Sequence, residues 1–129
     1  MFKFLRLIVA IALLLTTIGC TTIESATGIP RVYQATIADT ATTVIALSNG
    51  AHELNPAGFA GATIGKLVYL LYIRRDLTEE QQSNYDRVAT SLWTGAAANN
   101  AVQLLAPGTG LLLSLSLGAW VGWTIWQGW

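Results

Sequence analysis

The residues of this sequence that could do chemistry are a single cysteine, Cys20, and a single histidine, His52, which Glu53 follows. A histidine acts as a general base only when a partner group lies within hydrogen-bond distance in a pocket. No nucleophile motif, phosphate-binding loop or metal-ligand spacing accompanies His52. We therefore interpret His52 as a solvated or capping side chain. We expect a protein that is not an enzyme and that has no metal and no small-molecule substrate.

Cys20 ends an N-terminal segment that has the order of an export signal. Lys3 and Arg6 make the start basic, residues 7–15 are an unbroken apolar run, and mostly small or polar residues lead from there to Cys20. This order is typical of a secretory signal peptide. The run is too short to cross roughly 30 Å of hydrocarbon comfortably as a permanent helix. Because the chain has no second cysteine, an internal disulfide is excluded, and another role must explain Cys20.

The tetrapeptide Thr-Ile-Gly-Cys at residues 17–20 resembles the lipobox of bacterial lipoproteins. The resemblance implies that residues 1–19 are a signal peptide and that the sulfur of Cys20 carries covalent lipid, with no other cofactor. Several acyl chains together hold a protein permanently on a membrane. In this family an aspartate after the cysteine marks the inner membrane, so the resemblance and Thr21 favour the outer membrane. The alternative is an uncleaved signal anchor in which Cys20 is unmodified.

The composition indicates that part of the surface does not face water. Hydrophobic residues make up 53% of the chain and charged residues 11%, whereas charged residues make up about 25% of a typical soluble domain. Acidic and basic residues are equal in number, so no single-sign field is available to bind nucleic acid. Arg87 carries the last charged side chain, which leaves residues 88–129 with none. We therefore expect a lipid bilayer, and no nucleic acid, as a partner.

After the signal, the chain is predicted to be all-α, a small helical bundle or hairpin with two apolar, membrane-associated helices. Residues 20–30 are mostly small or polar and end at Pro30, so they are expected to form the lipidated tether, and residues 31–129 are expected to form a single domain. Thr78 and Gln81 have the spacing of a capping box, which marks a helix start. Apolar periodicity and helix-ending residues define the others. The predicted helices are residues 31–48, 57–73, 78–106 and 111–126.

Polar side chains interrupt two of these helices. Lys66 lies in the middle of residues 57–73, and a lysine at the centre of a bilayer costs about 2.5–3.5 kcal/mol on insertion scales. That helix is therefore either a membrane span shielded by a partner or a buried helix of a compact bundle. Asn99 and Asn100 interrupt the apolar part of the long helix. Because buried amides need partners, one of them is expected to hydrogen-bond to another helix.

Small residues recur at four-residue spacing on both apolar helices. They are Ala57, Gly61 and Gly65 on the first helix and Ser114, Gly118 and Gly122 on the second. Residues at this spacing share one helix face, and in membranes small residues let helix backbones approach closely. Both faces are predicted to pack against helices of this chain or of further copies, in a homo-oligomer or a larger membrane assembly. There is a weak likeness to glycine-zipper lipoproteins of the outer membrane. The alternative is chance in a chain rich in glycine and alanine.

Tryptophans end the chain at three-residue spacing, at Trp120, Trp123, Trp126 and Trp129. Tryptophan favours the membrane–water interface, where its ring is buried and its N–H stays hydrated. Because a spacing of three drifts around a helix, the rings are predicted to form a collar at one membrane level. The alternative is an aromatic face buried in a soluble core or in an oligomer interface.

Three functions remain open for this sequence. The first is a structural or accessory lipoprotein of a cell-envelope or virion membrane assembly. The second is a channel-forming or membrane-permeabilising protein of the holin type, because small-residue faces allow ring assembly. The third is a lipid-tethered soluble helical binding module whose apolar helices form its own core, which Lys66 and the modest helix lengths favour. We take the first as the leading hypothesis.

Overall fold

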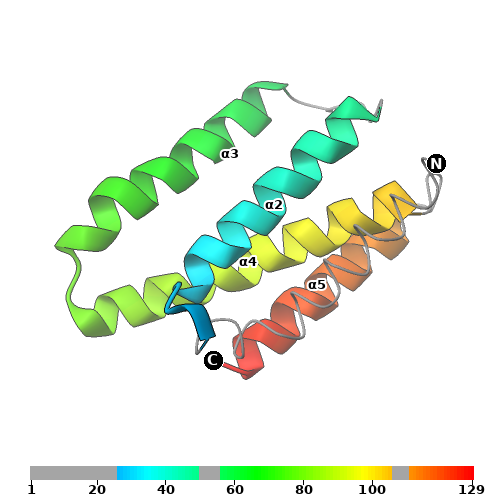
Figure 1. Ribbon diagram of the computed structural model, residues 1–129. Coiled ribbons are helices and arrows are strands. Elements are labelled where there is room, and N and C mark those ends of the chain that lie inside the picture. The colour runs from blue at the N-terminus through cyan, green and yellow to red at the C-terminus, as the bar shows by residue number, and fades with distance from the viewer. Residues whose placement is uncertain (1–25, 50–55, 106–110) are drawn as a thin grey trace.

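The computed structural model describes residues 26–49, 56–105 and 111–129, and the regular elements in these ranges are all helical (Figure 1). They are α2 (Arg31–Ser48), α3 (Pro56–Val68), the π-helical turn η1 (Tyr69–Ile73), the 3-10 turn η2 (Arg74–Asp76), α4 (Glu79–Leu105) and α5 (Leu111–Gln127). The predicted all-α class is therefore confirmed for the described residues. Residues 1–19, Cys20 and His52 lie outside the described ranges.

The long helix α4 is the centre of the arrangement. Helices α2 and α5 both pack along it, whereas α3 and η1 make only sparse contacts with the other helices (Figure 1). At one end of the bundle the start of α2 meets the end of α5, where the Arg31 guanidinium lies 5.2 Å from the centroid of the Trp129 ring. The indole N–H of Trp129 donates to Ser83 Oγ of α4 at 3.5 Å. Residues 26–30, which precede α2, therefore join the bundle close to the end of α5.

The start of α4 and the end of α5 lie at this end of the bundle, and side chains cap both of them. The backbone N–H of Thr78 donates to Gln81 Oε1 at 3.1 Å, and the backbone N–H of Gln81 donates to Thr78 Oγ1 at 3.3 Å. This confirms the capping box predicted at the start of α4. At the end of α5, two guanidinium nitrogens of Arg87 donate to the carbonyl oxygen of Trp126 at 2.9 and 3.2 Å. A cation at this position also suits the negative end of the helix dipole.

Helices α4 and α5 approach each other backbone to backbone. A Cβ atom added at Gly95 would lie 2.7 Å from the carbonyl oxygen of Gly118, and one added at Gly122 would lie 2.8 Å from the carbonyl oxygen of Ser91. Both separations are too short for a real side chain, and the obstacles are backbone atoms that cannot move aside. Glycine at these positions is therefore what permits the close contact.

The helix predicted over residues 57–73 requires a correction. Helix α3 ends at Val68, and the chain continues as η1, in which the backbone N–H of Arg74 donates to the carbonyl oxygen of Tyr69. Nowhere in residues 26–49, 56–105 and 111–129 is a helix both long enough and apolar enough to cross a membrane. The membrane-spanning alternative for this segment is therefore not supported.

Candidate functional site

Polar side chains are buried in this bundle and large apolar side chains are exposed, which reverses the usual order. Among the residues whose burial the structure describes, the buried hydrophobic ones are Val32, Ala35, Leu70 and Ala97. The buried polar or charged residues are Asp39, Thr42, Lys66, Asp86, Thr90, Ser91 and Thr94. Charged residues are almost never fully buried unless they are paired, and a large exposed apolar surface marks an interaction site. The polar interior and the apolar exterior together form the candidate functional site.

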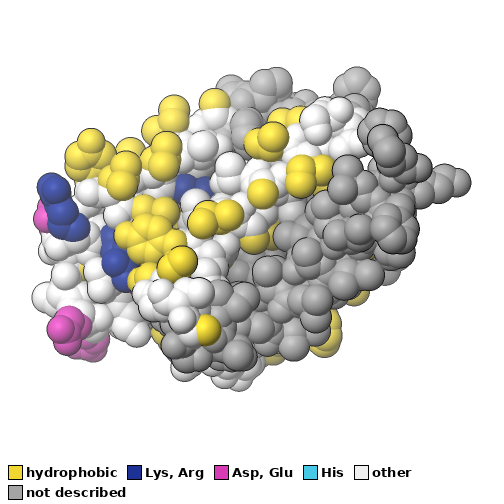
Figure 2. All heavy atoms as spheres, in the orientation of Figure 1, with side chains coloured by type: hydrophobic (Ala, Val, Ile, Leu, Met, Phe, Trp, Pro, Cys, Tyr) yellow, Lys and Arg dark blue, Asp and Glu magenta, His cyan; other side chains and the backbone are white. Residues whose placement is uncertain are grey.

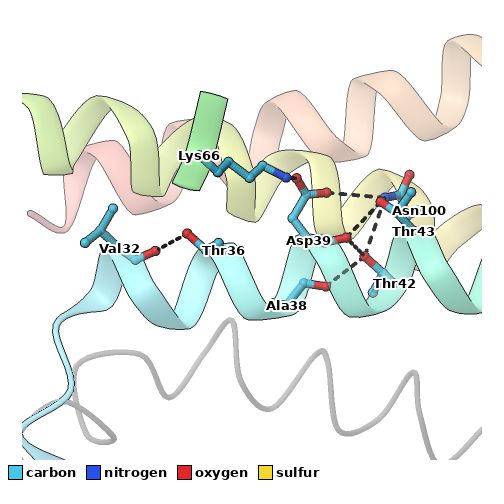
Figure 3. A network of polar contacts seen from close by, with 8 residues as sticks. All are labelled: Val32, Thr36, Ala38, Asp39, Thr42, Thr43, Lys66 and Asn100. Atoms are coloured by element: carbon cyan, nitrogen blue, oxygen red, sulfur yellow. Dashed lines mark hydrogen bonds and ion pairs between the residues drawn. The ribbon is translucent and has the colours of Figure 1, made fainter. Parts of the chain in front are cut away.

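The first polar cluster joins α2, α3 and α4 around Asp39 (Figure 3). The ammonium group of Lys66 forms an ion pair with Asp39 Oδ2, and the two residues are only 8% and 6% exposed. From α4, Nδ2 of Asn100 donates to Thr43 Oγ1 at 2.8 Å and to Asp39 Oδ1 at 3.4 Å. The Lys66 ammonium also lies 5.8 Å from the centroid of the Trp93 ring. The interhelical hydrogen bond predicted for one of the two asparagines is confirmed.

The second polar cluster joins η1 and η2 to α4 through the carboxylate of Asp86. Nε of Arg74 lies 3.1 and 3.0 Å from the two carboxylate oxygens, and a terminal nitrogen donates to Oδ2 at 2.9 Å. The hydroxyl of Tyr69 donates to Oδ1 at 2.7 Å. The same guanidinium lies 5.5 Å from the centroid of the Tyr33 ring of α2. This cluster therefore attaches η1 and η2, which follow α3 in the chain, to both α4 and α2.

Protonation of the second cluster is fixed by its surroundings. Burial, together with the hydrogen bond to Asp86, raises the pKa of the Tyr69 hydroxyl well above its usual range. The hydrogen bond to Asp86 raises the pKa of the Arg74 guanidinium. Both groups keep their protons near neutral pH, so their hydrogen bonds to Asp86 persist there.

The π-helical turn η1 explains how two side chains of one segment reach the same carboxylate. In an α-helix, residues five apart point in directions that differ by about 140°. In η1 the hydrogen bond from the Arg74 N–H to the Tyr69 carbonyl spans five residues, so the wider turn brings both side chains to one side. The distortion is therefore the local means of closing the Asp86 cluster.

The side of α3 and η1 that points away from the bundle is apolar, and we call it the α3 outward face. Its exposed residues are Ile64, Leu67, Val68, Leu71, Tyr72 and Ile73. Among them Ile64 and Leu71 are 60% and 56% exposed. Figure 2 shows hydrophobic side chains gathered along this segment. Because the polar residues of both clusters turn inward, the α3 segment is polar toward the protein and apolar toward its surroundings.

The apolar surface continues from the α3 outward face onto α2. A groove of about 570 Å³ lies between the two helices, and it is lined largely by apolar atoms. Ile37 and Val44 of α2 line this groove and are 65% and 52% exposed. From α3, Leu67 lines the same groove. The apolar exterior is therefore one surface shared by two helices.

The predicted small-residue faces have different surroundings. Gly118 and Gly122 of α5 lie against the backbone of α4, whereas Cβ atoms added at Gly61 and Gly65 of α3 would meet no heavy atom within 4 Å. The side chains of Ala57 and Ser114 lie outside what the structure describes. Within the described chain, the close approach is thus made by α5 and not by α3.

The tryptophans of the predicted collar divide into two pairs. Trp120 and Trp123 are 64% and 61% exposed. Trp126 lies beneath the guanidinium of Arg87, which is 3.9 Å from the ring centroid, and Trp129 contacts α2 and α4 as described above. Trp126 and Trp129 therefore attach the end of α5 to the bundle, while the rings of Trp120 and Trp123 remain exposed on the surface.

Sequence reasoning missed most of the polar interior. The sequence alone gives no role to Asp39, Tyr69 or Gly95. It favours a solvated polar start of the long helix for Asp86, which is wrong, because Asp86 is only 6% exposed and is paired with Arg74. A signal for the first cluster was present, because within residues 32–65 the sequence has only Asp39 and Glu53 as charged side chains, and Lys66 follows in an apolar run. Isolated opposite charges in apolar helices often pair. No comparable signal marks Tyr69, whose role depends on the π-helical turn.

Comparisons with known protein families, with characterised proteins and with solved structures found no match to this chain.

Proposed function

We propose that the chain is a lipid-anchored, membrane-associated helical protein, attached through Cys20, that serves as a structural or accessory component of a cell-envelope or virion membrane assembly. Its partners are the bilayer and further copies of the chain or other components of the assembly. The outer membrane is the favoured location. The observation that carries the proposal is the reversed distribution of polar and apolar side chains.

The energetics of this distribution favour a nonaqueous neighbour. Covering a fully exposed leucine or isoleucine side chain stabilises a complex by about 1.5–3 kcal/mol. Ile64, Leu67 and Leu71 of the α3 outward face are 60%, 49% and 56% exposed, so each would contribute roughly half of that. In the interior, Asp39 and Lys66 neutralise each other, and Asp86 is bound by two donors. Polar groups that face a bundle interior, beneath an apolar surface, are the arrangement of proteins in contact with lipid.

The end of the bundle that receives the tether also suits a membrane surface. Arg31 begins α2 directly after the tether and lies over the ring of Trp129. Arg87 lies over Trp126 at the same end of α5. Tryptophan side chains are enriched at the level of the lipid headgroups. Arginine side chains there place their alkyl stems along apolar surface and keep their charged tips in water. A lipid on Cys20 would therefore enter the membrane close to these groups.

The test is metabolic labelling of the expressed protein with palmitate, with and without an inhibitor of the lipoprotein signal peptidase. A Cys20→Ser variant is the matched control. The proposal predicts label that depends on Cys20 and an unprocessed precursor that accumulates under the inhibitor. Absence of label, with no change of size under the inhibitor, would overturn the lipid anchor and leave residues 7–18 as a retained apolar segment.

A second candidate function is a lipid-tethered helical binding module, and a specific groove favours it. A second groove of about 570 Å³ lies between α4 and α5, lined by Leu92, Leu115 and Trp123 among others. Leu92 and Trp123 are 66% and 61% exposed there, so an apolar helix or peptide could cover them. Flotation of the Cys20→Ser variant with vesicles at neutral pH separates the candidates, because a binding module is released from membranes once its lipid is absent, whereas an apolar exterior that contacts lipid predicts partial retention.

A further inference from the structure

We propose that the α3 outward face is the surface that this protein lays on a lipid bilayer, with the axis of α3 parallel to the membrane plane. The inference rests on the proposed lipid anchor at Cys20 and specifies which face that anchor brings to the membrane. The occupant of the face is lipid, rather than a second copy of the chain or another protein.

The polarity of the α3 segment carries the proposal. A helix on the surface of a water-exposed bundle turns its apolar side to the core and its polar side outward. Lys66 turns inward to Asp39 (Figure 3), and Tyr69 and Arg74 bind Asp86. Ile64, Leu67 and Leu71 are exposed. The two polar clusters fix this orientation from the inside. An amphipathic helix with its apolar side outward is suited to the boundary between headgroups and acyl chains.

Charge on this side of the molecule is compatible with burial in lipid. Among the described residues from Val32 to Ile73, the only charged side chains are Asp39 and Lys66, and these are paired and buried. Lipid can therefore cover the α3 outward face without removing water from a charged side chain of these described residues. Fluid acyl chains can follow the contour of this uncharged surface, whereas a second copy would need a complementary face.

The end of the face has the residues expected at a headgroup boundary. The guanidinium of Arg75 lies 5.9 Å from the centroid of the Tyr72 ring, and 69% of the Arg75 side chain is exposed. An arginine at the edge of an apolar surface places its alkyl stem along the acyl chains and its charged tip among the phosphates. Arg75 also forms an ion pair with Asp76 at 3.5 Å, so the apolar strip ends at an exposed charged pair that suits the hydrated headgroup layer.

The tether allows this contact. Between Cys20 and Arg31 an extended chain reaches at most roughly 35–40 Å. Tyr33, just inside α2, packs against Arg74, which follows η1 directly. The reach of the tether exceeds the length of α3, which is roughly 20 Å at 1.5 Å per residue. A lipid on Cys20 can therefore enter the membrane while the α3 outward face lies on it.

The experiment uses the lipidated full chain, reconstituted in vesicles of phosphatidylethanolamine and phosphatidylglycerol. Because lipid occupies the sulfur of Cys20, a cysteine introduced as Ile64→Cys or Leu71→Cys is the one free thiol and can carry a nitroxide label. Leu92→Cys is the matched control, since Leu92 is 66% exposed but borders the α4–α5 groove instead. Collision with oxygen and with a water-soluble nickel complex reports whether each label is in lipid or in water.

The proposal predicts that labels at Ile64 and Leu71 are several-fold less accessible to nickel and more accessible to oxygen than the label at Leu92. Equal nickel accessibility at all three sites, in protein that still floats with the vesicles, would overturn the inference and leave the lipid anchor intact. A label at Ile64 that is protected from nickel but shows strong dipolar broadening by the label of another molecule would also overturn the inference, because a second copy would then cover the face. Protein that lacks lipid on Cys20 by intact mass would refute the proposed function itself.

Discussion

Helices α5 and α3 both carry glycines at four-residue spacing, yet their surroundings differ. Gly118 and Gly122 of α5 meet the backbone of α4, while Gly61 and Gly65 of α3 meet no neighbouring heavy atom within 4 Å of an added Cβ. The difference lies in the partner, because α4 presents Ser91 and Gly95, which are also small and also four apart. Small-residue spacing on one helix is therefore not sufficient for close packing, which requires a second helix with a matching face.

The two helices also attach to the bundle by different forces. The α4–α5 contact is a close approach of two backbones, stabilised by van der Waals contact along the glycines. The α3 segment is attached instead by two charged clusters, around Asp39 and around Asp86. If this distinction is correct, charge removal should affect α3 most and added volume should affect α5 most. The following predictions test it in order of decreasing effect on the free energy of unfolding.

Asp39→Ala is expected to have the largest effect. It leaves the ammonium of Lys66 buried without its carboxylate, and removal of one partner of a buried ion pair costs about 3–5 kcal/mol. Urea unfolding followed by circular dichroism in a mild detergent measures the loss. The double variant Asp39→Leu with Lys66→Met is the control, and it should recover most of the stability because no charge is left buried. A loss below about 1 kcal/mol in the single variant would contradict the role of this cluster.

Gly118→Leu is expected to destabilise the protein by about 3 kcal/mol, at the upper end for overpacking, because the obstacle is the backbone of Gly95. The same substitution on α3, Gly65→Leu, should cost nothing measurable, since its Cβ meets open space. The two variants are compared by urea unfolding under identical conditions. Equal losses in both would show that the α3 glycines are also in close contact, contrary to our comparison.

Tyr69→Phe removes a hydrogen bond to the Asp86 carboxylate and should cost about 1.5 kcal/mol near neutral pH. The variant also changes the pH dependence. Because the folded-state pKa of Tyr69 is raised, the unfolded chain releases this proton first, and the stability present below about pH 10 is lost as the pH rises beyond it. Unfolding measured from pH 7 to 11 should therefore show a steeper alkaline decline in the wild type than in the variant. Parallel curves would refute the assignment.

Gly61→Ala should have the smallest effect and the opposite sign. Alanine is favoured over glycine in a helix interior by up to about 1 kcal/mol, and a methyl group at this position meets no heavy atom. The expected gain in the free energy of unfolding is about 0.5–1 kcal/mol in detergent. A loss of stability would indicate that another helix packs on this face.

Much of the fold could be predicted from the sequence because the signals are local. Apolar periodicity located the helices, and the Thr78 and Gln81 side chains form the predicted capping box. The end of α3 at Val68 could not be predicted, because the π-helical turn exists to bring Tyr69 and Arg74 to a carboxylate on another helix. Tertiary contacts of this kind do not appear in the apolar periodicity of the sequence.

The candidate site was harder to predict than the fold for a related reason. Apolar periodicity identifies which side of a helix differs from the other, but it does not state whether the apolar side faces the protein or its surroundings. The sequence leaves open whether Lys66 belongs to a shielded membrane span or to a buried helix of a bundle, and in the structure its side chain is buried in the bundle. Its partner, Asp39, lies in a threonine-rich helix whose sequence pattern gives no indication of a buried charge. The pairing follows only from the arrangement of the helices.

The most direct test of this account is the intact mass of the protein extracted from membranes. The account predicts a chain that begins at Cys20 and carries acyl chains, so that the apolar exterior belongs to a protein held permanently at a bilayer. A chain that begins at Met1 with an unmodified Cys20 would contradict it. In that case the lipid anchor would be refuted, and residues 7–18 would be a retained apolar segment.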